Sequence, residues 1–238
     1  MAGYDFTTAG SYARGTAPLT VHPFTWLIAG KLGTLTGIQN TAALLCQSGS
    51  SGDTFQLRFD TADAGLFRFV AVQAGSGASA VTTNAASTGG GTFIAIARCT
   101  SAISREAILN GDLANKGTNT TSTTPASIDR LSFGRKDDSA ATNQFEGVVY
   151  YSALWNTALS DSAITTLSAG AWPSDVSRSS LRCFWPHFIS YGGVIRDWCG
   201  RCHLTVNSGA ADTSSIRRSG PQPLVPAPVK RTRVLRTG

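Results

Sequence analysis

Apolar and polar side chains alternate with a period of two over several short stretches of the chain. The clearest stretch is 54–60, where Phe55, Leu57 and Phe59 are separated by polar residues. Alternation of this kind predicts a β-strand with one buried face. Short apolar runs between turn-forming residues predict further strands over 4–14, 24–31, 41–46, 65–73, 93–99, 105–109, 131–135, 145–155, 181–188 and 204–206. The intervening segment 75–91, rich in Gly, Ser, Ala and Thr, shows only weak strand character.

Two local signals add turns and a helix to this pattern. Asn110-Gly111 follows a strand-like segment and predicts a hairpin turn. Residues 160–169 predict a helix, because Ser160 is a capping residue, Ile164 and Leu167 share one face, and glycine follows at the end. Since short strands dominate and recur at regular spacing, the pattern predicts an all-β sandwich with one short helix.

Charge divides the chain into two parts. Residues 1–216 contain 14 Lys and Arg against 14 Asp and Glu, whereas residues 217–238 contain six Lys and Arg and no acidic residue. Charged residues make up 14% of the chain and hydrophobic residues 42%, which is the composition of a folded protein. We therefore expect a neutral sandwich domain over 1–216 and a basic, extended C-terminal arm over 217–238.

The predicted arm combines proline, apolar and basic residues. Four prolines between Pro221 and Pro228 exclude a helix or a central strand and favour an extended polyproline II path. At ~3.1 Å per residue, residues 219–238 would reach roughly 60 Å. The residues expected to dock on a partner are Leu224, Val225, Val229, Lys230, Arg231, Arg233, Val234, Leu235 and Arg236. Because no aromatic residues alternate with the basic ones for base stacking, docking on protein is favoured over binding nucleic acid.

Cysteine and histidine gather near the end of the predicted sandwich. Cys199-x-x-Cys202-His203, with Cys183 and His187 before it, has the ligand types for zinc, but a structural zinc site usually has two such pairs. The five cysteines are an odd count and no secretion signal is visible, so we expect reduced thiols and synthesis in a cytoplasm. The following aspartates form no dense calcium motif: Asp60, Asp63, Asp137 and Asp138. No metal or cofactor is therefore expected.

One long motif points to a family. Phe145–Gly170, an apolar strand that ends in Ala-Leu-Trp and leads through a turn into the capped helix, resembles the penultimate segment of laminin-G-like, concanavalin A-like jelly rolls. Further motifs follow the order of that family along the chain: Ala17–Leu27, Ile108–Asp112, Leu131–Arg135, Arg182–Pro186, Asp197–Gly200 and Leu204–Val206. The resemblance covers about residues 4–216. A single domain of this type with a proline-rich tail also resembles structural proteins of tailed bacteriophages.

The same superfamily includes laminarinase-type glucanases, which need paired carboxylates on one strand. Their Glu-x-Asp-x-x-Glu pattern is absent, and Glu106 and Glu146 are the only glutamates. Asp137-Asp138 lies in a polar segment typical of a solvated turn. The three histidines lie in no nucleophile motif: His22, His187 and His203. No catalytic residue is predicted.

Tryptophan is the residue type that suggests a ligand. Trp26, Trp155 and Trp185 lie within predicted strands and are expected in the core. Trp172 and Trp198 lie beside predicted turns and are candidate glycan contacts, since sandwich lectins stack sugars on exposed aromatic side chains.

These observations lead us to expect a non-enzymatic virion structural protein of a tailed bacteriophage. As a capsid decoration or minor capsid protein, it would be anchored by its arm to the major capsid protein or other virion proteins, with a homo-oligomer on the particle as one arrangement. Two alternatives stay open: an adhesin module of a tail or fibre that binds a host-surface glycan, and a nucleic-acid-binding protein acting through the basic arm. The apolar runs are too short to cross a bilayer, so no membrane partner is expected.

Overall fold

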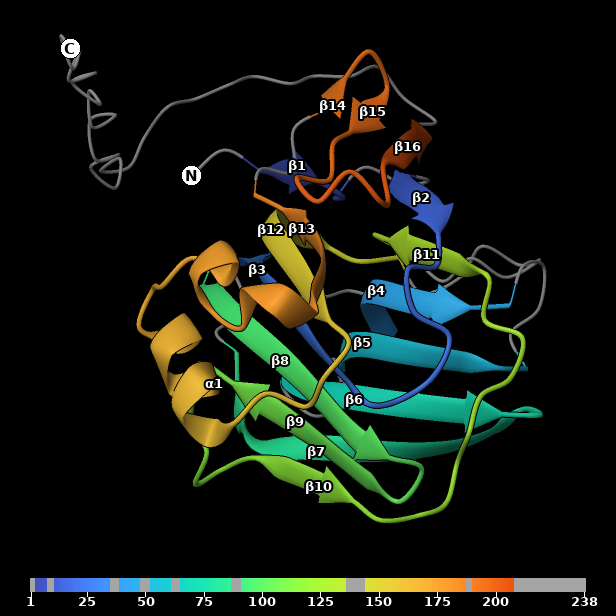
Figure 1. The fold of residues 1–238 in the computed structure, drawn as a ribbon, viewed down its shortest axis with the longest axis vertical. Helices are drawn as coiled ribbons and strands as arrows, with labels where there is room; N and C mark the ends of the chain where they lie inside the picture. The colour runs from blue at the N-terminus through green and yellow to red at the C-terminus, as the bar shows by residue number, and fades with distance from the viewer. Residues whose placement is uncertain are drawn as a thin grey trace, which may run out of the picture.

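Two antiparallel β-sheets face each other in the computed structural model, which describes residues 3–7, 11–34, 39–47, 52–60, 65–86, 91–135, 144–186 and 190–207 (Figure 1). Sheet A consists, in spatial order, of β1 (Tyr4–Asp5), β12 (Gly147–Trp155), β3 (Phe24–Leu32), β8 (Thr92–Ser101), β9 (Ser104–Leu109) and β10 (Gly117–Asn119), with β13 (Leu181–Trp185) also paired to β12. Sheet B consists of β14 (Ser190–Tyr191), β15 (Val194–Ile195), β16 (Leu204–Asn207), β2 (Tyr12–Thr16), β11 (Arg130–Phe133), β4 (Gln39–Cys46), β5 (Thr54–Asp60), β6 (Leu66–Gln73) and β7 (Ser76–Ala85). The predicted β-sandwich is confirmed.

The core lies between the two sheets and is dominated by aromatic side chains. Phe55, Leu57 and Phe59 of β5 are all buried, as the period of two predicted. Trp26 of β3 meets Phe133 of β11 edge-on, with 6.0 Å between the ring centroids. Each fully buried side chain of this size stabilises the fold by about 1.5–3 kcal/mol. The three tryptophans expected in the core are fully buried.

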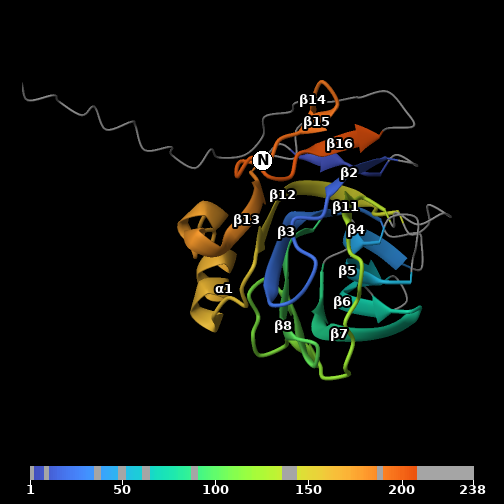
Figure 2. The same ribbon diagram turned by 45° about the vertical axis from the view of Figure 1, so that its right-hand side comes forward.

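The outer face of sheet A carries a helical layer (Figure 2). Helix α1 (Asp161–Ser168) is capped by Ser160, whose Oγ accepts a hydrogen bond of 3.3 Å from a backbone N–H in the first turn. Ile164 and Leu167 of α1 are buried in a second apolar cluster on this face. Arg98 of β8 holds the start of the helix, because its Nη1 lies 2.7 Å from the carboxylate of the first helical residue.

Two 3₁₀ turns, η1 (Pro173–Asp175) and η2 (Arg178–Ser180), lead from α1 into β13. None of the described helices is long and apolar enough to cross a membrane.

Two strand predictions at the start and end of the sandwich need correction. The predicted strand 4–14 is two strands in different sheets, since β1 pairs with β12 in sheet A and β2 pairs with β11 and β16 in sheet B. The predicted strand 181–188 ends as β13 at Trp185, and β14 and β15 form a separate hairpin of sheet B. In both places the sheet to which a residue pairs depends on partners far away in sequence.

The hairpin and the weak strand also differ from expectation. Asn110 and Gly111 are left-handed, with φ of 54° and 74°, but β10 pairs with β9 only from Gly117 onward, so the connection is longer than a two-residue hairpin. The tight hairpin lies between β8 and β9, where Ser101 pairs with Ser104. Residues 76–85 of the glycine- and serine-rich segment form a strand, β7, because β6 pairs with it from Gln73 to Arg68 and again, after a register shift, at Leu66.

Candidate functional site

Residues 197–202 form a loop between β15 and β16 that is fixed by one buried carboxylate. Asp197 is only 4% exposed. Its Oδ1 accepts hydrogen bonds from the backbone N–H groups of Phe184 and Cys199, at 2.8 and 3.0 Å. Its Oδ2 accepts from those of Arg201 and Cys202, at 2.8 and 3.0 Å. Hydrogen bonds to an ionised acceptor are stronger than neutral ones, so this carboxylate ties the whole loop to β13.

Local backbone chemistry supports the same loop. Gly200 has a φ of 72°, a conformation that favours glycine, and its N–H closes a turn onto the carbonyl of Asp197 at 3.1 Å. The N–H of Trp198 donates to the carbonyl of Phe184 at 2.7 Å. The motif Asp-Trp-Cys-Gly thus fixes the loop backbone, and with it the positions of its two exposed side chains, Trp198 and Arg201.

Trp198 presents an aromatic surface at this loop. Its side chain is 70% exposed, and its ring stacks on buried Phe184 with a centroid distance of 5.9 Å and an interplanar angle of 13°. Trp172 is only half-buried and packs between two aromatic neighbours, with ring-centroid distances of 5.8 Å to Phe184 and 6.0 Å to Tyr151. Trp198 therefore offers an open ring face, on which an apolar face of a ligand can stack.

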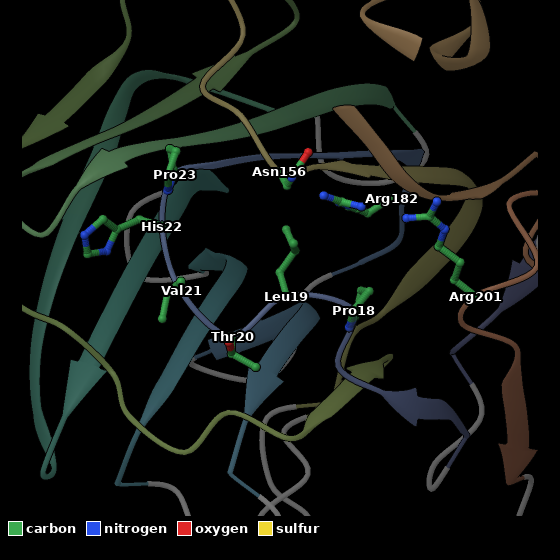
Figure 3. A pocket seen from close by; sticks show the side chains of 9 residues that line it. All are labelled: Pro18, Leu19, Thr20, Val21, His22, Pro23, Asn156, Arg182 and Arg201. Carbon is green, nitrogen blue, oxygen red and sulfur yellow. The ribbon is translucent and has the colours of Figure 1, made fainter. Parts of the chain in front are cut away.

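A cleft of about 390 Å³ lies next to this loop (Figure 3). Its walls come from the connection between β2 and β3, from the end of β12, from β13 and from the loop 197–202. The described residues that line it are Pro18, Leu19, Thr20, Val21, His22, Pro23, Asn156, Arg182 and Arg201. No acidic residue is among them, so two guanidinium groups set the charge of the cleft.

Asn156 orients one of these guanidinium groups. Its backbone N–H donates to the carbonyl of Ser180 at 2.9 Å. With its side-chain amide assigned in the orientation that gives both ends a partner, the amide nitrogen donates to the same carbonyl at 2.8 Å. The amide oxygen accepts from Nε of Arg182 at 3.1 Å and also from its Nη2. Arg182 is thus held on one edge, and its Nη1 has no partner among the described residues. Within the described part of the chain, neither Arg182 nor Arg201 forms an ion pair with a carboxylate.

Two carboxylates considered for catalysis or metal binding, Glu106 and Asp60, form ion pairs within the fold. Glu106 binds Arg98 and also Lys116, whose Nζ lies 2.6 Å from Oε1. Burial alone would raise the pKa of Glu106, but the hydrogen bonds from both cations lower it. Asp60 pairs with Arg58 and Arg68. The arm residues 224–236 and four residues considered for metals or catalysis lie outside the described residues: Asp63, Asp137, Asp138 and His187.

The five cysteines are free thiols. The structure brings Cys183 and Cys202 together, and their hydrogen bond, followed by burial, raises the pKa of Cys183. Cys202 also donates to the carbonyl of Thr16 at 2.9 Å. Among the described residues, no three His, Cys, Asp or Glu side chains are placed to hold a metal ion.

Sequence reasoning proposed Trp172 and Trp198 as glycan contacts, and it did not single out the cleft residues Asn156, Arg182 and Arg201. One signal was available, because residues 171–207 contain four arginines and two aspartates although the sandwich as a whole is neutral. The segments that form the cleft are far apart in sequence, so the pattern alone did not bring them together.

Comparisons with known proteins agree with this architecture. The model of the concanavalin A-like lectin/glucanases superfamily matches residues 9–165, whereas no curated protein matches the sequence. Among solved structures, the CBM40 module of the Ruminococcus gnavus IT-sialidase, bound to α2,3-sialyllactose, is 14% identical. The match covers 71% of this chain and 96% of that module, with a TM-score of 0.54.

A protein from Bacteroides ovatus, provisionally described as carbohydrate-binding, is 16% identical, with a TM-score of 0.52. The match covers 83% of this chain but only 58% of that protein, so this chain spans less than two thirds of its length. Identities this low show a shared fold and nothing more. The family model, however, covers well over half of the 238 residues, and the chain belongs to the concanavalin A-like lectin/glucanases superfamily.

Proposed function

We propose that this protein is a non-catalytic, lectin-like recognition module that binds carbohydrate at the loop 197–202. The observation that carries the proposal is Trp198, whose ring is 70% exposed and yet held in place by its stack on Phe184. Asp197 fixes the backbone below it. A preorganised aromatic side chain loses little conformational entropy when a ligand stacks on it. Two structures of the same fold support this choice of ligand class, one bound to sialyllactose and the other provisionally described as carbohydrate-binding.

The positions of the two glutamates support binding without hydrolysis. Glu106 lies on β9, and Glu146 directly precedes β12, with β3 and β8 between those strands in sheet A. At ~4.8 Å per strand, three strand spacings alone separate them by roughly 14 Å across the sheet. They also lie at opposite ends of β12, because Glu106 is level with Trp155 in the strand register. Glycosidase carboxylates lie only about 5–9.5 Å apart. Glu106 is also bound to two cations.

A glycan array followed by calorimetric titration tests the binding function. Trp198→Ala should lower the affinity for the best glycan at least tenfold, because it removes the stacking surface. The matched control is Ile103→Ala, which removes another exposed apolar side chain (56% exposed) at the β8–β9 turn. Both variants should melt at the wild-type temperature. Unchanged binding by Trp198→Ala, or equal losses in both variants, would contradict the proposed site.

We further propose that the module is displayed on the virion of a tailed bacteriophage, as a capsid decoration or minor capsid protein made in the host cytoplasm. The change from a neutral sandwich to a basic, proline-rich segment at 217–238 supports an attachment arm. The protein partners would be the major capsid protein or other virion proteins. An adhesin on a tail or fibre would use the same glycan site with a different attachment point.

Co-sedimentation with purified phage particles tests this location. The full-length chain should pellet with particles, and the chain lacking 217–238 should not. If neither form pellets, the virion location is wrong. If the full-length chain instead binds naked DNA with a steep salt dependence that disappears with the arm, the arm is a nucleic-acid-binding segment.

A further inference from the structure

We infer that the cleft lined by Arg182 and Arg201 is a subsite for the charged group of an acidic saccharide, one that carries a carboxylate or a sulfate. This inference rests on the proposed carbohydrate-binding function and specifies its ligand class. Two guanidinium groups, those of Arg182 and Arg201, extend into the cleft from separate segments of the chain (Figure 3). No acidic residue lies among the described residues that line it.

The guanidinium group of Arg182 is oriented in advance for binding an anion. In the amide orientation that satisfies both ends of Asn156, its side-chain oxygen accepts from Nε and Nη2 of Arg182, and its side-chain and backbone nitrogens both donate to the carbonyl of Ser180. The neutral amide fixes the guanidinium plane without neutralising its charge. Nη1 is left to donate to an oxyanion, and guanidinium groups bind planar and tetrahedral oxyanions through directed hydrogen bonds.

Arg201 supplies the second charge from an anchored backbone. Its N–H donates to the Oδ2 of Asp197 at 2.8 Å, which sets the direction in which its exposed side chain leaves the loop. Two cations that face one cleft without a carboxylate repel each other, and a bound anion relieves that repulsion. Arg58, Arg68 and Arg98 each have an acidic partner, whereas neither arginine of the cleft has one among the described residues.

The remaining walls suit a sugar ring rather than a bare ion. Pro18, Leu19 and Val21 give the cleft an apolar side, and Val21 is 58% exposed. The volume of about 390 Å³ lies at the lower end of the usual range of ligand pockets, ~300–1,000 Å³. Arg201 links the cleft to the proposed carbohydrate site, because it belongs to the same loop, 197–202, as Trp198.

Calorimetric titration of the full-length protein with three probes tests the subsite: α2,3-sialyllactose, 3′-sulfolactose and lactose. The first two carry a carboxylate and a sulfate on the same neutral core. Wild type should bind one or both charged probes at least tenfold more tightly than lactose, and the stronger of the two identifies the preferred group. Arg182→Gln and Arg201→Gln should each remove about tenfold of this preference, the size expected for a charged hydrogen bond, and leave lactose binding unchanged.

Arg178→Gln is the matched control, because it removes the same charge from an exposed arginine of the closing segment that does not line the cleft. It should leave all three affinities unchanged, and thermal melts should show that all variants fold. If all three probes bind equally through Trp198, the subsite is wrong and the carbohydrate function stands. An equal loss in Arg178→Gln would show general charge attraction and also overturn the subsite. If no probe or arrayed glycan binds, both proposals fail.

Discussion

Replacing Asp197 with Asn would change one atom of the loop 197–202 and should strongly destabilise the folded protein. Each carboxylate oxygen accepts two backbone N–H groups, from Phe184 and Cys199 on Oδ1 and from Arg201 and Cys202 on Oδ2. In either orientation, the amide of asparagine places an NH₂ group against two N–H donors. Two buried donors lose their acceptor, and the side chain is only 4% exposed, so water cannot easily replace it.

An unsatisfied buried donor costs about 1–3 kcal/mol. Two of them should lower the free energy of unfolding by about 2–5 kcal/mol. Urea unfolding, followed by far-UV circular dichroism, measures this change. Because the loop carries Trp198 and Arg201, glycan binding should fall together with stability.

The control for this substitution is Asp175→Asn, which makes the same chemical change at an exposed aspartate of η1. It should change the free energy of unfolding by less than about 0.5 kcal/mol. A loss below about 1 kcal/mol in Asp197→Asn would refute the reasoning, because it would mean that the four N–H groups find other acceptors.

Three further predictions concern the framework around the site. Arg105→Met should lower the free energy of unfolding by about 3 kcal/mol in urea, because the buried guanidinium donates to carbonyls of the 102–123 segment that would lose their donor. Glu106→Gln should remove a pH-dependent part of the free energy of unfolding. The folded pKa of Glu106 lies below its unfolded value. The stabilisation by the Glu106 carboxylate is therefore complete above about pH 4.5 and is lost as the pH falls through the folded pKa. Thermal melts from pH 3 to pH 7 would show a flatter profile in the variant. With iodoacetamide at pH 8, Cys199 should react first, since it is only partly buried, whereas burial raises the pKa of Cys99 to about 12. Peptide mass spectrometry after timed quenching would show the order of modification. Early modification of Cys99 would contradict the prediction.

The sequence by itself determined the elements whose signals are local. The alternation over 54–60 and the cap at Ser160 led to β5 and α1 with nearly the predicted bounds. Local signals suffice there, because the period of a strand and the capping of a helix are set within a few residues. The order of family motifs also allowed the sandwich, and with it the burial of the core tryptophans, to be predicted.

The tertiary structure alone decided which strands pair and where the candidate site lies. β1 and β2 are neighbours in sequence but join opposite sheets, because each finds its hydrogen-bond partners on a different distant strand. The cleft draws on Pro18–Pro23, Asn156, Arg182 and Arg201, four segments whose separate patterns carry no common signal. Charge and shape at a site depend on distances in space, and the antiparallel pairing of β12 with β13 and the hydrogen bonds of Asp197 set those distances.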